Sequence, residues 1–144
     1  RTKMHKAYAY VSVADSARFF VHREWNKTLE RGKQVRSRSS SRDWHRLRIQ
    51  AKRLRDTMDF FATVQPAKWS HRLRRCKDLQ NLLGKHQDAV TAGQRLERFV
   101  EKIPPGSASR KLLVAIGRLE QTEDDRARMR RKRFKKTWRR FRKN

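Results

Sequence analysis

Basic side chains recur along one side of the segment between residues 44 and 61. Four of them, spaced by three, four and three positions, are His45, Arg48, Lys52 and Arg55. On an α-helix this spacing keeps them within an arc of about 80°. Arginine offers a planar fork to phosphate oxygens, and lysine or protonated histidine adds compact donors. The pattern favours binding of an extended polyanion, and the alternative is an ordinary solvated basic face.

A second stretch repeats the pattern. Its aligned polar side chains, separated by three, four and four positions, are Arg74, Lys77, Asn81 and Lys85. Asp88 falls on the same side and is placed to orient a neighbouring cation. A solvated face with local ion pairs is again the alternative, but two aligned basic stripes are harder to attribute to chance than one.

The C-terminal stretch from residue 126 to 143 holds 12 basic residues in 18. A disordered basic tail or a nonspecific nucleic-acid patch would have this composition. Phe134, Trp138 and Phe141, however, are spaced by four and three residues, which is typical of a packed helix face. We therefore expect a docked helix with basic outer faces.

Overall charge agrees with an anionic partner. The 144 residues include 40 Lys and Arg against 14 Asp and Glu, a formal net charge of +26. Such an excess destabilises a compact chain by self-repulsion unless an anion offsets it. Nucleic acid, an anionic membrane surface and polyphosphate all qualify. No apolar run approaches the 18 residues of a membrane span, so we expect no membrane insertion.

Signatures of catalysis are not visible. The sequence shows no glycine-rich phosphate loop, nucleophile elbow or pair of catalytic carboxylates. Its five histidines show no ligand-like pairing, and the single cysteine, Cys76, allows neither a disulfide nor a cysteine zinc site and suits a reducing cytoplasm. An acidic cluster at residues 120–125 reads as a solvated patch that offsets the basic tail. We predict a protein that is not an enzyme and needs no metal or cofactor.

The elements that position these residues are predicted to be helices, since no stretch alternates strictly between apolar and polar residues. The stripe at 44–61 has an apolar counterpart about 120° away, formed by Leu47, Ala51, Leu54, Met58 and Phe61. Gly32 is expected to close the first helix. Ser40 or Ser41 can cap the second, with Ser40 and Asp43 forming a capping-box-like pair.

Pro66 and the Pro104-Pro105-Gly106 break divide the rest of the chain. The predicted helices span roughly residues 7–31, 42–64, 67–102 and 107–142 of a single domain, 1–144. The fold class is all-α, an elongated antiparallel four-helix bundle. In the last helix the expected apolar seam is Leu113, Ile116, Leu119, Ala127, Phe134, Trp138 and Phe141.

Three blocks of residues resemble the CHAD domain (conserved histidine α-helical domain) family. The first is His45-x-x-Arg48-x-x-x-Lys52-Arg53-x-Arg55 followed by Phe60-Phe61. The second is Leu79-Gln80-x-x-Leu83-Gly84-x-x-x-Asp88-Ala89, and the third is Trp138-x-x-Phe141 among arginines. The blocks occur in the order that the family has and span residues 43–141.

The resemblance implies a helical domain that binds inorganic polyphosphate through basic side chains. It also implies association with polyphosphate granules and, often, a neighbouring triphosphate-tunnel (CYTH) domain. The family domain has two four-helix bundles, so this chain would be its C-terminal half. We therefore expect either that an N-terminal half-domain is missing from this sequence or that two copies of the chain pair and rebuild the cleft between the two bundles.

The resemblance makes His45 the namesake histidine and adds Arg53, which lies off the basic stripe. The expected polyphosphate-binding residues are His45, Arg48, Lys52, Arg53, Arg55, Arg74, Lys77, Lys85 and Arg139. The expected function is a non-catalytic polyphosphate-binding or granule-targeting module in the cytoplasm. A basic helical protein that binds nucleic acid nonspecifically is the alternative.

Overall fold

A computed structural model describes residues 12–64 and 66–143, without the side chains of Pro66 and Lys68. Its four helices are α1 (Val13–Gln34), α2 (Ser41–Ala62), α3 (Pro66–Glu101) and α4 (Arg110–Arg142). The described residues form no strand, and the predicted all-α class is confirmed. The predicted bounds are close, except that residues 7–11 lie outside the described residues, α1 ends three residues later than expected and α4 begins three residues later than expected.

The helix starts follow the capping chemistry. Ser40 is the N-cap of α2: its Oγ accepts a hydrogen bond from the Asp43 backbone N–H at 3.2 Å and donates to Asp43 Oδ2 at 2.8 Å. Ser12 and Asp15 repeat this arrangement at α1, and Ser109 Oγ caps α4. Each hydroxyl satisfies one of the backbone N–H groups that a helix start leaves unpaired.

The helices pack in sequence order, α1 on α2, α2 on α3 and α3 on α4. Aromatic side chains close the bundle: the rings of Trp25 on α1 and Phe141 on α4 stack with centroids 4.4 Å apart. Trp44 on α2 contacts the Phe134 ring of α4 edge-on at 4.9 Å. Both α4 aromatics are buried, so the prediction that the basic C-terminal stretch is a docked helix is confirmed.

Gly32 does not end α1, which continues to Gln34. Instead it lies inside the last turn, where the Trp138 ring of α4 occupies the space that a Cβ would take. The glycine therefore serves close approach between α1 and α4 rather than helix termination. The prediction that Gly32 closes the first helix is therefore wrong, although the residue does have a structural role at the end of that helix.

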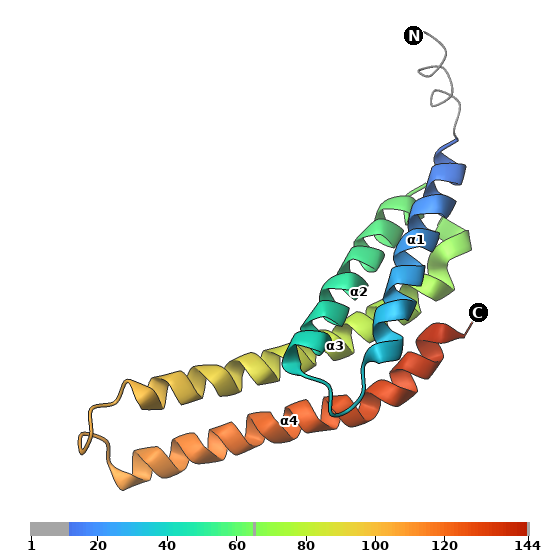
Figure 1. Ribbon diagram of the computed structural model, residues 1–144. Coiled ribbons are helices and arrows are strands. Elements are labelled where there is room, and N and C mark those ends of the chain that lie inside the picture. The colour runs from blue at the N-terminus through green and yellow to red at the C-terminus, as the bar shows by residue number, and fades with distance from the viewer. Residues whose placement is uncertain (1–11, 65, 144) are drawn as a thin grey trace, which may run out of the picture.

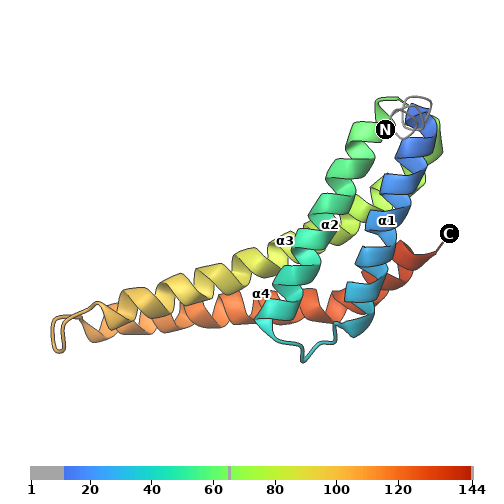
Figure 2. The ribbon, with the colours of Figure 1, turned by 45° about the horizontal axis from the view of Figure 1, so that its top comes forward.

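The distal part of the α3–α4 pair lies outside the bundle. Figures 1 and 2 show the distal parts of α3 and α4 running side by side, antiparallel, beyond the ends of α1 and α2. We call residues 91–125 the arm. The prediction that Leu113 and Leu119 line a buried seam is wrong, since 45% and 54% of their surfaces are exposed. Two helices alone cannot cover apolar residues on every side of α4.

Candidate functional site

Asp59 joins the two predicted basic stripes. It lies on α2, one turn after Arg55, whose Nε donates to Asp59 Oδ2 at 3.2 Å. Lys77 of α3 approaches the other carboxylate oxygen, with Nζ 3.5 Å from Oδ1. Arg55 Nη1 also donates to Gln80 Oε1 of α3 at 2.7 Å. The two helices thus present Arg55 and Lys77 side by side at their shared surface.

The remaining α2 residues of the stripe follow the same helix side toward its N-terminus. Arg48 is half-buried, and His45 and Lys52 are exposed. Trp44, Leu47 and their apolar partners fix this orientation because the core side of α2 is fully enclosed. The α2 stripe is therefore held in place by the packing of the opposite side.

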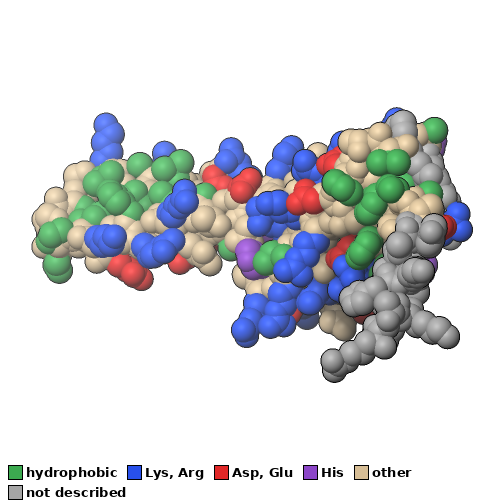
Figure 3. All heavy atoms as spheres, turned by 90° about the horizontal axis from the view of Figure 1, so that it is seen from above, with side chains coloured by type: hydrophobic (Ala, Val, Ile, Leu, Met, Phe, Trp, Pro, Cys, Tyr) green, Lys and Arg blue, Asp and Glu red, His purple; other side chains and the backbone are tan. Residues whose placement is uncertain are grey.

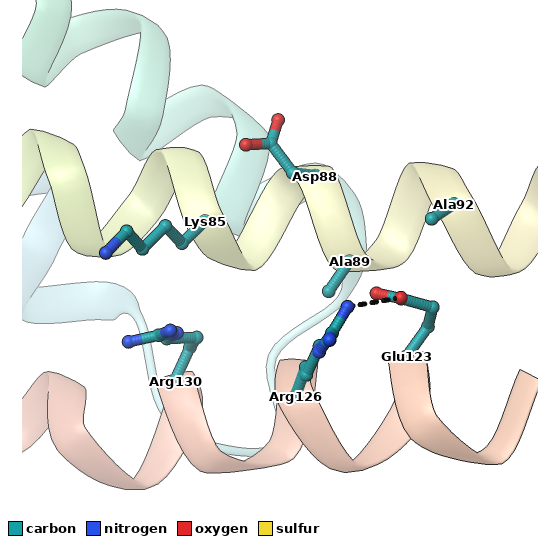
Figure 4. A pocket seen from close by; sticks show the side chains of 7 residues that line it. All are labelled: Lys85, Asp88, Ala89, Ala92, Glu123, Arg126 and Arg130. Carbon is teal, nitrogen blue, oxygen red and sulfur yellow. Dashed lines mark hydrogen bonds and ion pairs between the residues drawn. The ribbon is translucent and has the colours of Figure 1, made fainter. Parts of the chain in front are cut away.

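On α3, Arg74, Lys77 and Lys85 are all exposed on the outer side of the helix. Lys85 lies at the edge of a cleft of about 490 Å³ between α3 and α4. Figure 4 shows its side chain and that of Arg130 from α4 extending in the same direction along this cleft, while the Asp88 carboxylate points away from α4. The α3 stripe is thereby continued onto α4.

Arg126, one turn before Arg130, lines the same cleft. Its Nη1 forms an ion pair with Glu123 Oε1 at 2.7 Å, drawn as a dashed line in Figure 4. We call the combined surface the basic face. Its members are His45, Arg48, Lys52 and Arg55 of α2, Arg74, Lys77 and Lys85 of α3, and Arg126 and Arg130 of α4.

Two predicted residues lie elsewhere. Arg53 lines a pocket of about 180 Å³ with Arg31 and Arg46, between α1 and α2 and on the other side of α2 from the stripe. Arg139 is exposed on α4, one turn after Lys135, which lines a cleft of about 510 Å³ beneath the loop between α1 and α2. The structure does not bring either side chain to the basic face.

Four residues of this site are absent from the sequence-based prediction. The sequence analysis counts Arg126 and Arg130 only among the basic residues of the C-terminal stretch, although their four-residue spacing places them on one side of a helix. Gln80 is an uncharged residue off the α3 stripe, and it is half-buried with its amide oxygen accepting from Arg55. Asp59 carries a detectable signal, since an acid four residues after an arginine pairs with it on a helix.

Two titratable groups lie beneath the basic face. His86 is 2% exposed; its ring packs on Trp44 at 4.8 Å and its Nε2 lies 3.4 Å from Arg131 Nη1. Burial, and secondarily the Arg131 charge, lowers the pKa of His86 to about 4. Burial likewise raises the pKa of the Cys76 thiol to about 12, and its Sγ donates to the Ala51 carbonyl oxygen at 3.6 Å. Both groups are neutral at physiological pH and belong to the core.

Among the described residues, no group of three His, Cys, Asp or Glu side chains is arranged to hold a metal ion. Within the same residues, no helix combines the length and apolarity needed to cross a membrane. The candidate functional site is the basic face, an array of hydrogen-bond donors on three adjacent helices.

Comparison with known proteins identifies the family to which the chain belongs. No curated protein and no solved structure matches the chain. A family model described as CHAD domain matches residues 2–97, which include the α2 stripe and the α3 stripe but not Arg126, Arg130 or the Trp138-x-x-Phe141 block. The matched stretch is more than half of the 144 residues, and the chain therefore belongs to the CHAD domain family.

Proposed function

We propose that the basic face binds inorganic polyphosphate. The observation that carries this proposal is the convergence of two stripes from different helices, joined where Arg55 and Lys77 share Asp59. A flexible phosphate chain needs cations at repeated intervals along a surface rather than one deep pocket. Arginine and lysine supply these contacts by replacing the counterions that such a chain condenses.

Family membership supports the same ligand, since the resemblance of the sequence to CHAD domains implies polyphosphate binding.

Binding without catalysis is part of the proposal. Two acids at the basic face, Asp59 and Glu123, are each engaged by cations of the same surface, and the carboxylate of a third, Asp88, points away from α4. Phosphoryl transfer chemistry would call for carboxylates free to hold divalent metal ions. Targeting to polyphosphate granules would follow from such binding.

Nucleic acid is the competing ligand, and one observation favours polyphosphate over single strands. Proteins that bind single-stranded nucleic acid stack bases on exposed aromatic side chains. All four tryptophans here are buried, each at most 7% exposed: Trp25, Trp44, Trp69 and Trp138. The exposed phenylalanines, Phe19, Phe20, Phe60 and Phe99, are not members of the basic face. The face offers charge without stacking surfaces, which fits a chain of phosphates without bases.

Calorimetric titration of long-chain polyphosphate over a salt series tests the proposal. The logarithm of the binding constant should fall linearly with the logarithm of salt concentration, with a slope set by the number of phosphates neutralised. Competition then separates the ligands. If duplex DNA or RNA displaces polyphosphate at equal phosphate concentration, the ligand assignment is wrong. Release of inorganic phosphate with Mg²⁺ or Mn²⁺ above background would contradict the non-catalytic role.

A further inference from the structure

The arm, residues 91–125, differs from the rest of the chain in charge. It contains six Lys and Arg and six Asp and Glu, so its formal net charge is zero. The whole +26 of the protein therefore lies outside it. Figure 3 agrees, with most of the blue side chains of that view over the bundle and hydrophobic side chains gathered on the arm. The arm is thus poorly suited to bind a polyanion.

Apolar side chains on the arm are exposed on more than one side. Phe99 on α3 is 53% exposed, and four residues of α4 are between 42% and 54% exposed: Leu112, Leu113, Val114 and Leu119. By helical spacing Leu112 and Leu119 lie on one flank of α4, and Leu113 lies on the other. A helix that is apolar around its circumference is typically buried on several sides. The arm therefore has the character of a helix pair that is covered in an assembly.

The charges of the arm are also ordered along its length. The two helices of the arm run antiparallel, with Ala92 of α3 and Glu123 of α4 lining the same cleft, so the tip half of the arm is residues 98–117. It has four basic residues and one acidic residue, a net charge of +3. The half nearer the bundle, residues 91–97 and 118–125, has two basic and five acidic residues, a net charge of −3. When two arms lie antiparallel, the basic tip of each faces the acidic part of the other. The sequence is therefore complementary to itself in this orientation.

We propose that two copies of this chain associate through their arms, packed antiparallel about a two-fold axis into an intermolecular four-helix bundle. A two-fold interface uses the same surface on both copies, which requires a self-complementary surface of this kind. Two helical hairpins that bury their apolar sides against each other form a stable bundle. Two chains of charge +26 repel strongly, and the neutral arm is the part that can approach its copy without that repulsion.

The first test is the molar mass of the 144-residue chain without polyphosphate, by light scattering and sedimentation over a range of protein concentrations. We expect a dimer in about 0.15 M salt, where charges farther apart than about 8 Å are screened. L119E should produce a monomer. M129E is the matched control, because Met129 is on the same helix and 51% exposed against 54% for Leu119, but lies outside the arm. M129E should remain dimeric.

The second test uses the charge order. Reversing the tip with R110E and K111E, or the acidic part with D124K and D125K, should weaken the dimer at least tenfold. The quadruple variant restores complementarity and should recover the dimer. Circular dichroism and urea unfolding check that each variant is folded. A monomeric wild-type chain, a dimer unaffected by L119E, or failure of the quadruple variant to recover association would overturn the proposal. These outcomes are independent of whether polyphosphate is the ligand.

Discussion

Arg55 of α2 donates a hydrogen bond to Gln80 of α3 at 2.7 Å, while its Nε is engaged by Asp59. The guanidinium is thereby fixed between two helices instead of moving freely in solvent. Lys77 approaches the same Asp59 from α3. An anion that replaces Asp59 would meet both cations already in position, which reduces the ordering cost of binding.

Replacing Asp59 with Asn should tighten polyphosphate binding two- to fivefold. The carboxylate competes with phosphate for Arg55 and Lys77, and exposed pairs of this kind contribute about 1 kcal/mol or less to stability. Calorimetric titration measures the Kd, and urea unfolding should show a loss below about 1 kcal/mol. Weaker binding by D59N would instead assign Asp59 a positioning role that outweighs its competition.

Removing two cations from the α2 stripe, with R48A and K52A, should weaken polyphosphate binding and lower the log–log salt slope by about 1.4, taking the coefficient for single-stranded polyanions. The charge-matched control is R31A with R46A, which empties the pocket on the other side of α2. It should leave the slope nearly unchanged. Equal losses in both pairs would show that diffuse charge, not the stripe, binds the ligand.

Arg53 shares that pocket with Arg31 and Arg46. The family resemblance includes it among the ligands, whereas its position excludes it from the basic face. R53A should therefore bind polyphosphate like the wild type in the same titration, and a clear loss would mean that the ligand wraps around α2.

His86 should make stability depend on pH. Its pKa is about 4 in the folded chain against 6.5 for the ordinary group, because burial disfavours the charged form and Arg131 adds repulsion. Between these values the unfolded chain binds a proton that the folded chain does not. The contribution of His86 to the free energy of unfolding is therefore fully present above about pH 6.5, and about 3 kcal/mol is lost as pH decreases to about 4.

Urea unfolding at both pH values measures this loss, and H86Q is the comparison. The variant loses the packing of the ring on Trp44, so its stability at neutral pH is lower, but the part of the pH dependence that belongs to His86 should disappear. Glu24 contributes separately. Burial raises its pKa, yet the hydrogen bond from Gln50 and the charges of Lys27 and Arg23 leave it below the ordinary value, so its contribution is lost at more acidic pH. An unchanged pH profile in H86Q would contradict the assignment.

Gly32 and Gly84 should respond oppositely to alanine. At Gly32 a Cβ would overlap the Trp138 ring, and overpacking of this kind costs about 1–3 kcal/mol. At Gly84 an added methyl group would meet nothing within 4 Å, so alanine should stabilise helix α3 by about 0.5–1 kcal/mol. Urea unfolding of both variants gives the comparison, and a stabilised G32A would mean that Trp138 is free to move aside.

Local features of the fold are predictable where the chemistry is local. The Ser40–Asp43 cap, the 3.6-residue periodicity of α2 and the Phe134–Trp138 spacing each depend on neighbours in the sequence, and the structure confirms each of them. The prediction for Gly32 is wrong because its role depends on Trp138, more than a hundred residues away in the chain.

The candidate site is predictable helix by helix but not as an assembly. Stripe membership follows from spacing on one helix, so Arg55 and Lys77 can each be proposed. Which flank of α4 faces α3 depends on tertiary packing, which is why the prediction omits Arg130 and includes Arg139. Leu119 is predicted to lie in a buried seam because periodicity cannot show how many helices surround a given turn.

Cys76 lies between α2 and α3, its thiol enclosed and directed at the Ala51 carbonyl oxygen. With a pKa of about 12 it resists thiol reagents until these two helices separate. The rate at which a thiol reagent labels Cys76 therefore reports how often the two helices that carry the basic stripes separate. A ligand that binds both helices favours the packed state and slows the labelling, while one that contacts a single helix does not.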